Sequence, residues 1–319
     1  MKKEETSTAY PPDLSLRFKS LDCSDRRIIS SYAEKYNQYS CEYSFASLYM
    51  WNDLYRYKLA FFNGWLIVLD TRNNYLLMPM GADVNFAGLL ELSLEMKQAG
   101  YSGDISNVPP EFIEKNPDLV QYYDIENERA MAEYVYSTEN LVTLGGKKLR
   151  KKRNHISRFF RKHPDYQVRS LSSNAVREDC LTLVEDLALA AGSGTVDKGI
   201  HGEAIAIQKG MGDFKRIPLE GIAIYVKKGT GERLAGFAVY SRLNREVYII
   251  HFEKVDYSYP GIAQVINWET AKVLREECRY INREQDLGIP GLRKAKLSYE
   301  PELIYPAIFL KFRGSSQEA

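Results

Sequence analysis

The sequence predicts a mixed α/β protein built from two lobes, each with its own sheet and flanking helices. The chain has 319 residues, a length beyond which a single hydrophobic core usually stops growing. Its hydrophobic fraction of 45% and its charged fraction of 27% are those of an ordinary globular protein. In addition, the order strand, helix, strands, helix in the first half recurs in the second half, without obvious sequence identity between the two.

Short apolar runs separated by turn residues predict the elements of the first half. Asn63-Gly64 stands between two such runs and is the dipeptide most typical of a tight hairpin. Asp22 or Ser24 is suited to cap a helix, and Gly100 is suited to end another. The expected strands are 16–22, 57–62, 65–70 and 75–80, and the expected helices begin near residue 24 and near residue 84.

The second half repeats these signals. Gly229 and Gly231 predict a turn between two strands, whereas Gly192-Ser193-Gly194 and the glycines at 210–212 are interpreted as helix ends and not as phosphate loops. A loop is expected between residue 283 and the last strand. The expected strands are 166–171, 219–227, 233–241, 246–254, 279–283 and 303–312, and the expected helices are 175–191, 200–212 and 261–276. We expect a first lobe at 1–145, a basic linker helix at 146–165 and a second lobe at 166–319.

Composition limits the classes of function and location. The formal net charge is +1, so the overall charge indicates neither a nucleic acid nor a membrane partner. The cysteines form no CxxC pair, and we therefore expect no metal site. The polar N-terminus MKKEETSTAYPPD does not resemble a secretory signal, and no window approaches the ~18 consecutive apolar residues of a membrane span. We expect a cytoplasmic protein with reduced thiols, and peripheral attachment to a membrane stays open.

The most specific sequence in the chain lies at residues 280–301. It reads YINREQDLGIPGLRKAKLSYEP. Together with YSYPGIAQVINW at 257–268 and GGKKLRKKRNH at 145–155, it resembles a bacterial family related to the C-terminal domain of phosphatidylglycerol lysyltransferases. Members of that family are similar to tandem GNAT acyltransferase folds and to Fem-type aminoacyltransferases. The resemblance therefore implies α/β architecture with mixed sheets, arranged as two GNAT-like lobes in tandem.

The same resemblance implies an acyl- or aminoacyltransferase. GNAT proteins that use acetyl-CoA carry a glycine-rich pyrophosphate loop, whereas residues 256–263 here read DYSYPGIA, with one glycine and one proline. The resemblance therefore favours aminoacyl-tRNA over acyl-CoA as the donor, with an amine or hydroxyl of a small molecule or lipid headgroup as the acceptor. A second interpretation stays open, namely a catalytically idle GNAT-like module that binds a small ligand, RNA or protein.

Strand 246–254 changes from apolar to titratable at its C-terminal end. Strict alternation would place His251 and Glu253 on one face of this strand. In the GNAT fold that end lies where the acyl donor and the acceptor meet, so either residue is a candidate base for the attacking amine or hydroxyl. The structural alternative is a strand that simply emerges into solvent. No Ser-His-Asp arrangement or HExxH motif is recognised in the sequence.

A group of polar residues follows the short strand at 279–283. Arginines there are suited to grip a carboxylate or phosphate, and a lysine can supply a point charge to a phosphate or carbonyl oxygen. The structural alternative is an ion network in which Arg283 and Arg293 pair with Glu284 and Asp286. The residues expected to contact substrate are Asn282, Arg283, Glu284, Asp286, Arg293, Lys296 and Tyr259.

Segment 147–163 holds nine lysines or arginines, two histidines and no acidic residue. A basic amphipathic helix of this kind suits the backbone of tRNA or an anionic membrane surface. The alternative is a solvated linker helix with Ile156 and Phe160 docked in the core. The residues expected to contact a polyanion are Lys147, Lys148, Lys151, Lys152 and Arg153.

Overall fold

The computed structural model describes residues 16–36, 39–190 and 198–314, and within these ranges it contains two seven-stranded sheets. The polar N-terminus and Gly192-Ser193-Gly194 lie outside the described residues. The first sheet contains, in spatial order, β1 (Lys19–Ser20), β2 (Lys58–Phe62), β3 (Trp65–Asp70), β4 (Tyr75–Leu77), β5 (Ile105–Ser106), β14 (Ile308–Phe312) and β6 (Tyr123–Asn127). The second contains β13 (Leu303–Tyr305), β7 (Glu133–Ser137), β12 (Tyr280–Gln285), β11 (Val247–Val255), β10 (Gly231–Arg242), β9 (Glu220–Lys228) and β8 (Gln167–Ser170).

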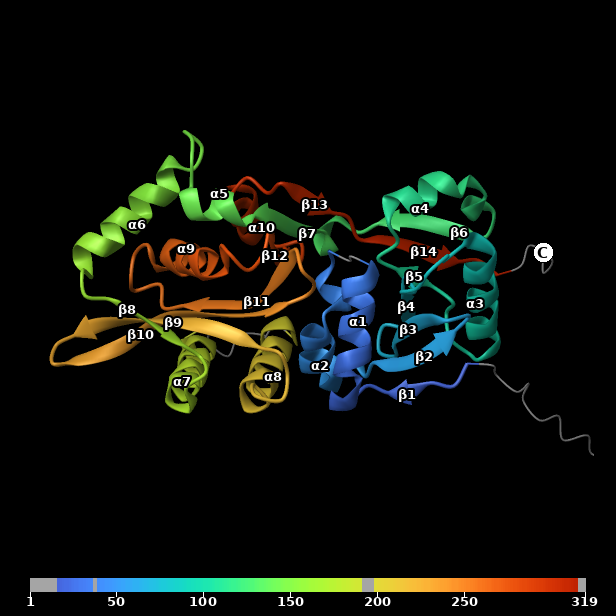
Figure 1. Cartoon of the computed structure of the whole chain (residues 1–319), viewed down its shortest axis with the longest axis horizontal. Helices are drawn as coiled ribbons and strands as arrows, with labels where there is room; N and C mark the ends of the chain where they lie inside the picture. Colours follow the sequence, from blue (N-terminus) through green and yellow to red (C-terminus); the bar gives the residue numbers. More distant parts are fainter. Residues whose placement is uncertain (1–15, 37–38, 191–197, 315–319) are drawn as a thin grey trace, which may run out of the picture.

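Helices cover the sheets, and Figure 1 shows the two sheets beside each other along the long axis of the molecule. None of the helices in the described ranges is both long enough and apolar enough to cross a bilayer. The helices are α1 (Arg26–Tyr36), α2 (Phe45–Tyr55), α3 (Phe86–Gln98), α4 (Pro110–Lys115), α5 (Thr138–Thr143), α6 (Arg150–Lys162), α7 (Asn174–Ala190), α8 (Lys198–Gly212), α9 (Ile262–Leu274) and α10 (Pro290–Leu297).

The two lobes repeat one order of elements. The first lobe runs β1-α1-α2-β2-β3-β4-α3-β5, and the second runs β8-α7-α8-β9-β10-β11-α9-β12. In both sheets these five strands lie in chain order. Each sheet also has one parallel pair, β4 with β5 and β11 with β12, among antiparallel neighbours. The predicted fold class, two GNAT-like lobes in tandem with mixed sheets, is therefore confirmed.

Each repeat is followed by a strand that belongs to the sheet of the other lobe. Strand β7 follows the first repeat but pairs with β12 and β13, and β14 follows the second repeat but pairs with β5 and β6. Figure 1 shows β14 reaching away from β13 into the first sheet. The predicted domain boundaries at residues 145 and 166 stay a prediction, because β7 and β14 each belong to one lobe in sequence and to the sheet of the other lobe in space.

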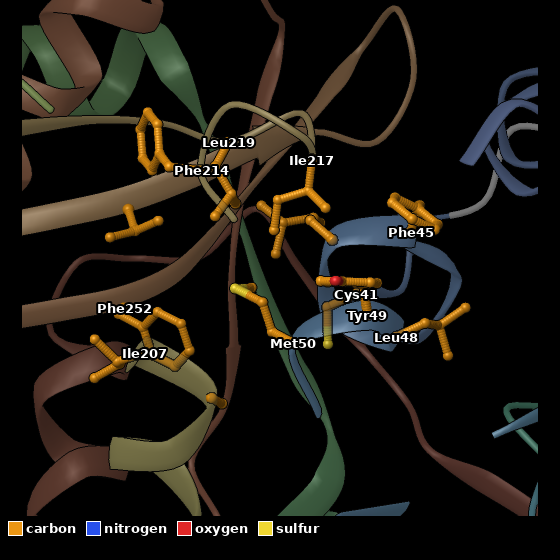
Figure 2. Packing of buried hydrophobic residues seen from close by; sticks show 14 of the residues in the cluster. Cys41, Phe45, Leu48, Tyr49, Met50, Ile207, Phe214, Ile217, Leu219 and Phe252 are labelled. Carbon is orange, nitrogen blue, oxygen red and sulfur yellow. The ribbon is translucent and has the colours of Figure 1, made fainter. Parts of the chain in front are cut away.

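The largest hydrophobic cluster joins the lobes. It combines side chains of α1, α2 and the first sheet with side chains of α7, α8 and the second sheet. In Figure 2, Met50 of α2 lies between Tyr49 of the same helix and Ile207 of α8. Burial of this apolar surface makes the lobes one packed unit. Residues 45–50 of α2 are all buried, so the helix has no exposed polar face at this end.

Three expectations for local structure differ from the fold. The expected loop after residue 283 contains helix α10, whose first turn begins at Pro290, a residue suited to that position. The expected strand 303–312 is two strands, because Pro306 interrupts the ladder and the pieces enter different sheets. Helix α2 was not expected at all. The Asn63-Gly64 hairpin is confirmed, with both residues at positive φ as a type I′ turn requires.

Candidate active site at the fork of strands β11 and β12

Strands β11 and β12 form a fork in the centre of the second sheet. They pair in parallel only at their beginnings, through Val247 with Tyr280, Tyr248 with Ile281 and Ile249 with Asn282. Their C-terminal ends are not paired to each other, so polar side chains from both strands occupy the space between them. The fork has two faces, one toward α2 and one toward α9.

A β-bulge in β11 determines which side chains reach each face. Opposite β11, Tyr240 of β10 pairs with Ile250 and its neighbour Val239 pairs with Phe252, which leaves His251 without its own partner. A bulge inverts the alternation that follows it. His251 consequently faces α2, whereas Glu253 faces α9. The expectation that these two residues share a face is wrong for this reason.

A second bulge lies in β12. Asn282 pairs with Val135 and Gln285 pairs with Glu133, so Arg283 and Glu284 together stand opposite a single residue of β7. Glu284 has a φ of 55°, a left-handed conformation that is costly for a residue with a side chain. Arg283 lies on the α9 face and Glu284 on the α2 face, where it meets His251, in continuation of the alternation set by Tyr280 and Ile281.

On the α2 face, His251 links a carboxylate to a hydroxyl. Its Nδ1 lies 3.2 Å from Oε1 of Glu284, and its Nε2 lies 2.8 Å from Oγ of Ser241. This is the atom order of a serine–histidine–carboxylate relay, which the sequence did not reveal because the three residues come from three strands. Ser241 is fully buried whereas the side chain of Glu284 is 21% exposed. Glu284 is therefore the member that a ligand can reach, and Ser241 orients the imidazole from behind.

Two further carboxylates adjoin Glu284 and complete a group that we call the carboxylate cluster, namely Glu42, Glu133 and Glu284. Glu133 is buried and accepts hydrogen bonds from the main-chain N–H of Cys41 at 2.8 Å and from Nδ2 of Asn282 at 2.5 Å. Burial is the main cause that raises the pKa of Glu133. Burial, followed by the charges of Glu133 and Glu284, raises the pKa of Glu42 to about 8.

The carboxylate cluster lacks a basic partner. In the part of the chain that the structure describes, no lysine or arginine forms an ion pair with any of its three members. Its residues come from the short 3-10 helix Cys41–Tyr43 of the first lobe and from two strands of the second sheet. Sequence reasoning missed Glu42 and Glu133, since neither lies in a motif and they meet only through the tertiary fold.

The α9 face of the fork is filled by an ion pair. Nε of Arg283 donates to Oε2 of Glu253 at 2.9 Å. The guanidinium also lies over the rings of Tyr136 and Tyr299, at 5.8 Å and 5.1 Å from their centroids. The side chains of Arg283 and Glu253 are only 14% and 18% exposed. The charge of Glu253 is thus neutralised by Arg283, and the role of Glu253 as a base stays a prediction.

The other residues expected to bind substrate hold the end of β12 in place. Asp286 is buried and accepts a bidentate pair from Arg293, with Nε at 2.7 Å and Nη2 at 2.8 Å, and the hydrogen bond from Arg293 holds the pKa of Asp286 well below its usual range. The ammonium of Lys296 donates to main-chain carbonyls, and burial lowers the pKa of Lys296 to about 8. Asn282 donates to Glu133 and to the carbonyl of Tyr39. Their roles toward a substrate stay predictions.

The basic segment forms helix α6 and the turn before it. Ile156 and Phe159 face the core, with Phe159 rather than Phe160 fully buried. Most of its cations are exposed, including Lys147, Lys148 and Lys151. Three of the cations have partners. Arg153 donates to the carbonyls of the loop at 144–146, Lys152 lies 4.0 Å from the ring centroid of Tyr299, and Lys148 donates to Oε2 of Glu300 at 2.6 Å. Tyr259 packs against the ring of His163 at the end of α6, away from the fork.

Comparison with known proteins places this fold in a family. A solved structure of a conserved protein of unknown function from Bacteroides thetaiotaomicron matches with a TM-score of 0.86 and 29% identity, over 93% of this chain and 100% of that one. A protein of unknown function from Mycoplasmoides gallisepticum is 25% identical over 225 residues, which is 68% of this chain and 67% of the relative.

A third match is a solved domain that shares the fold. The C-terminal domain of a putative lysylphosphatidylglycerol synthetase from Agrobacterium fabrum aligns over 90% of this chain and 92% of that one, with a TM-score of 0.60 and 13% identity. The family model described as phosphatidylglycerol lysyltransferase, C-terminal, matches residues 33–309. This match spans both lobes, and the chain therefore belongs to the family of phosphatidylglycerol lysyltransferase C-terminal domains.

Proposed function

We propose that the protein transfers an acyl group, specifically an aminoacyl group, at the α2 face of the fork. The observation that carries this proposal is the partly exposed carboxylate of Glu284, held against His251 beside Glu42 and Glu133, which form no ion pair with a described lysine or arginine. An aminoacyl ester carries an ammonium group, which is the cation that such a cluster attracts. Family membership supports a transferase but does not define the substrate.

The proposed reaction is a direct aminolysis or alcoholysis of an ester. The nitrogen or oxygen of the acceptor forms a bond to the ester carbonyl carbon while the bond to the leaving ribose oxygen breaks. Glu284 accepts the proton of the acceptor and returns it to the leaving oxygen. His251, oriented by Ser241, positions Glu284, and the carboxylate cluster holds the ammonium of the donor. The step needs no further reactant.

The packing of α6 supports aminoacyl-tRNA rather than acyl-CoA as the donor. GNAT proteins that use acetyl-CoA bind its pyrophosphate at the start of the helix that corresponds to α9. Here a Cβ built on Gly261, the residue before α9, would lie 2.6 Å from the main-chain oxygen of His155 in α6. Helix α6 therefore lies directly over the place where a pyrophosphate would bind, and it presents cations to solvent instead.

Glu284→Gln is expected to lower aminoacyl transfer by about 100-fold, the usual scale for loss of a general base. The assay uses total bacterial tRNA charged with all amino acids and hydroxylamine as a small nucleophile, with hydroxamate products identified by mass spectrometry. Glu302→Gln, which changes an exposed carboxylate, serves as the control. If Glu253→Gln lowers the rate of hydroxamate formation more than Glu284→Gln does, the general base is Glu253 on the α9 face. If no product depends on the protein, the proposed transferase function is contradicted.

Helix α6 and its preceding turn are proposed to bind the tRNA backbone. Replacing Lys147, Lys148, Arg150 and Lys151 with glutamine should reduce the slope of log affinity against log salt by about 0.9 for each phosphate that is no longer neutralised. Four exposed lysines elsewhere provide the matched control, namely Lys97, Lys115, Lys215 and Lys228. The measurement is tRNA binding by fluorescence anisotropy at several salt concentrations. Equal slopes for the two quadruple variants would contradict the proposal, and stronger binding to anionic vesicles would assign the surface to a membrane.

One observation favours the alternative of an idle binding module. On the α9 face, the Arg283–Glu253 pair and the rings of Tyr136 and Tyr299 occupy the fork. A module without transfer activity would leave the α2 face to bind a cationic small molecule. The hydroxamate assay separates these two functions, since a binding module forms no product.

A further inference from the structure

Lys296 makes an unusual set of contacts for a lysine close to a candidate active site. It lies in α10 and is buried, and its ammonium donates to the main-chain carbonyls of three successive residues, Arg283, Glu284 and Gln285. Its Nζ lies 3.0 Å from the carbonyl oxygen of Glu284 and 2.6 Å from that of Gln285. An ammonium has three N–H donors, so these carbonyls use its whole donor capacity. No donor remains for a substrate.

The three carbonyls belong to the bulge that contains Glu284 and to the residue that follows it. A bulge removes residues from the ladder, and their polar main-chain groups then need other partners. The N–H of Glu284 donates to Oδ1 of Asn282 at 2.7 Å. Side chains therefore satisfy both main-chain groups of Glu284, at a residue whose left-handed conformation is costly without such support.

We propose that Lys296 is a positioning residue that holds this bulge and thereby aims the carboxylate of Glu284 at His251. The importance of this orientation of Glu284 for catalysis rests on the function proposed above. The contact of Lys296 with the bulge does not depend on that function. Lys294 lies on the same helix and is exposed. It therefore offers a matched lysine that carries the same charge but does not contact the bulge.

The first test observes the contact between Glu284 and His251 directly. In protein labelled with ¹⁵N-histidine, the Nδ1 resonance of His251 is the one that is absent from the spectrum of His251→Gln. The spectrum of Glu284→Gln then shows where this resonance lies when no carboxylate contacts Nδ1. Lys296→Met is expected to move the Nδ1 resonance to the position seen in Glu284→Gln, and Lys294→Met is expected to leave it unchanged. A wild-type resonance position in folded Lys296→Met would overturn the proposal.

The second test measures the consequence for ligand binding. L-alaninamide carries one ammonium group, and isobutyramide is its neutral counterpart of similar shape. Lys296→Met is expected to lower the preference for L-alaninamide over isobutyramide by about 10-fold, since misplacing a binding group by about 1 Å has effects of this size or larger. In the Glu284→Gln background, the same substitution is expected to have no further effect, because residues that act through one another are not additive.

The outcomes separate the positioning role from the proposed function. If the wild-type protein shows no preference for L-alaninamide, the proposed function is contradicted, and the histidine resonance alone decides the role of Lys296. If Lys296→Met lowers the preference equally in both backgrounds, Lys296 does not act through Glu284. If Lys296→Met does not fold, Lys296→Gln retains two N–H donors and is expected to shift the resonance in the same direction by a smaller amount. An unchanged resonance in that variant also overturns the proposal.

Discussion

Arg283→Met is expected to lower the free energy of unfolding by about 3–5 kcal/mol, the usual cost of removing one partner of a buried ion pair. The substitution leaves the carboxylate of Glu253 in the fork without a cation, and it also removes the packing of the guanidinium on two tyrosine rings. Urea denaturation followed by tryptophan fluorescence measures the change. The double variant Arg283→Met with Glu253→Gln is expected to recover most of the loss.

An exposed pair provides the control for this prediction. Arg169 pairs with Glu232 and lies over the ring of Tyr225, but the side chains of the pair are 36% and 35% exposed. Arg169→Met is expected to cost less than about 1 kcal/mol, since solvent screens such pairs. Similar losses for the two arginines, or no recovery in the double variant, would show that the pair in the fork is not a structural element of the sheet.

Glu42→Gln is expected to stabilise the protein increasingly as the pH rises. Burial raises the pKa of Glu42 to about 8 in the folded state, whereas the ordinary value of 4.5 applies to the unfolded chain. Below pH 4.5 the carboxyl group is protonated in both states. Between that pH and about pH 8 the unfolded chain releases this proton more readily, so the wild-type protein loses stability. Glutamine cannot release a proton, and the variant avoids this loss.

The gain for Glu42→Gln should reach on the order of 4 kcal/mol near pH 8, because the folded and unfolded pKa values of about 8 and 4.5 differ by roughly 3.5, and each unit corresponds to ~1.4 kcal/mol. Melting temperatures at intervals between pH 4.5 and 9 measure it against the wild-type protein. Glu91→Gln, which changes an exposed carboxylate on α3, should show no such trend. A difference between Glu42→Gln and the wild-type protein that does not vary with pH would contradict the prediction.

The order of elements could be predicted because each repeat contains strong local signals. The hairpin at Asn63-Gly64 and the amphipathic pattern of α9 depend on neighbouring residues alone. Helix α2 escaped prediction because both of its sides pack between the lobes, so the sequence FASLYMW shows no polar face. The exchange of β7 and β14 between the sheets was not predicted either. Which of two similar sheets a strand joins depends on tertiary contacts, and no local sequence pattern indicates these.

The candidate site could be located from the sequence only approximately. Arg283 and Glu253 were each expected at a functional site, and the structure brings their side chains together. Their faces could not be derived, because a bulge adds one residue to a strand without a consistent sequence signature. Glu42 comes from the other lobe, and its approach to Glu284 is a result of the packing between lobes.

The exchange of β7 and β14 has a consequence for synthesis on the ribosome. The first sheet needs β14 (residues 308–312) between β5 and β6, yet β14 is synthesised after all the other strands that the structure describes. Until β14 has left the ribosome, the nascent first lobe exposes two unpaired strand edges, those of β5 and β6, which are sites for wrong pairing. The first sheet can therefore be completed only after all the described strands of the second sheet have been synthesised.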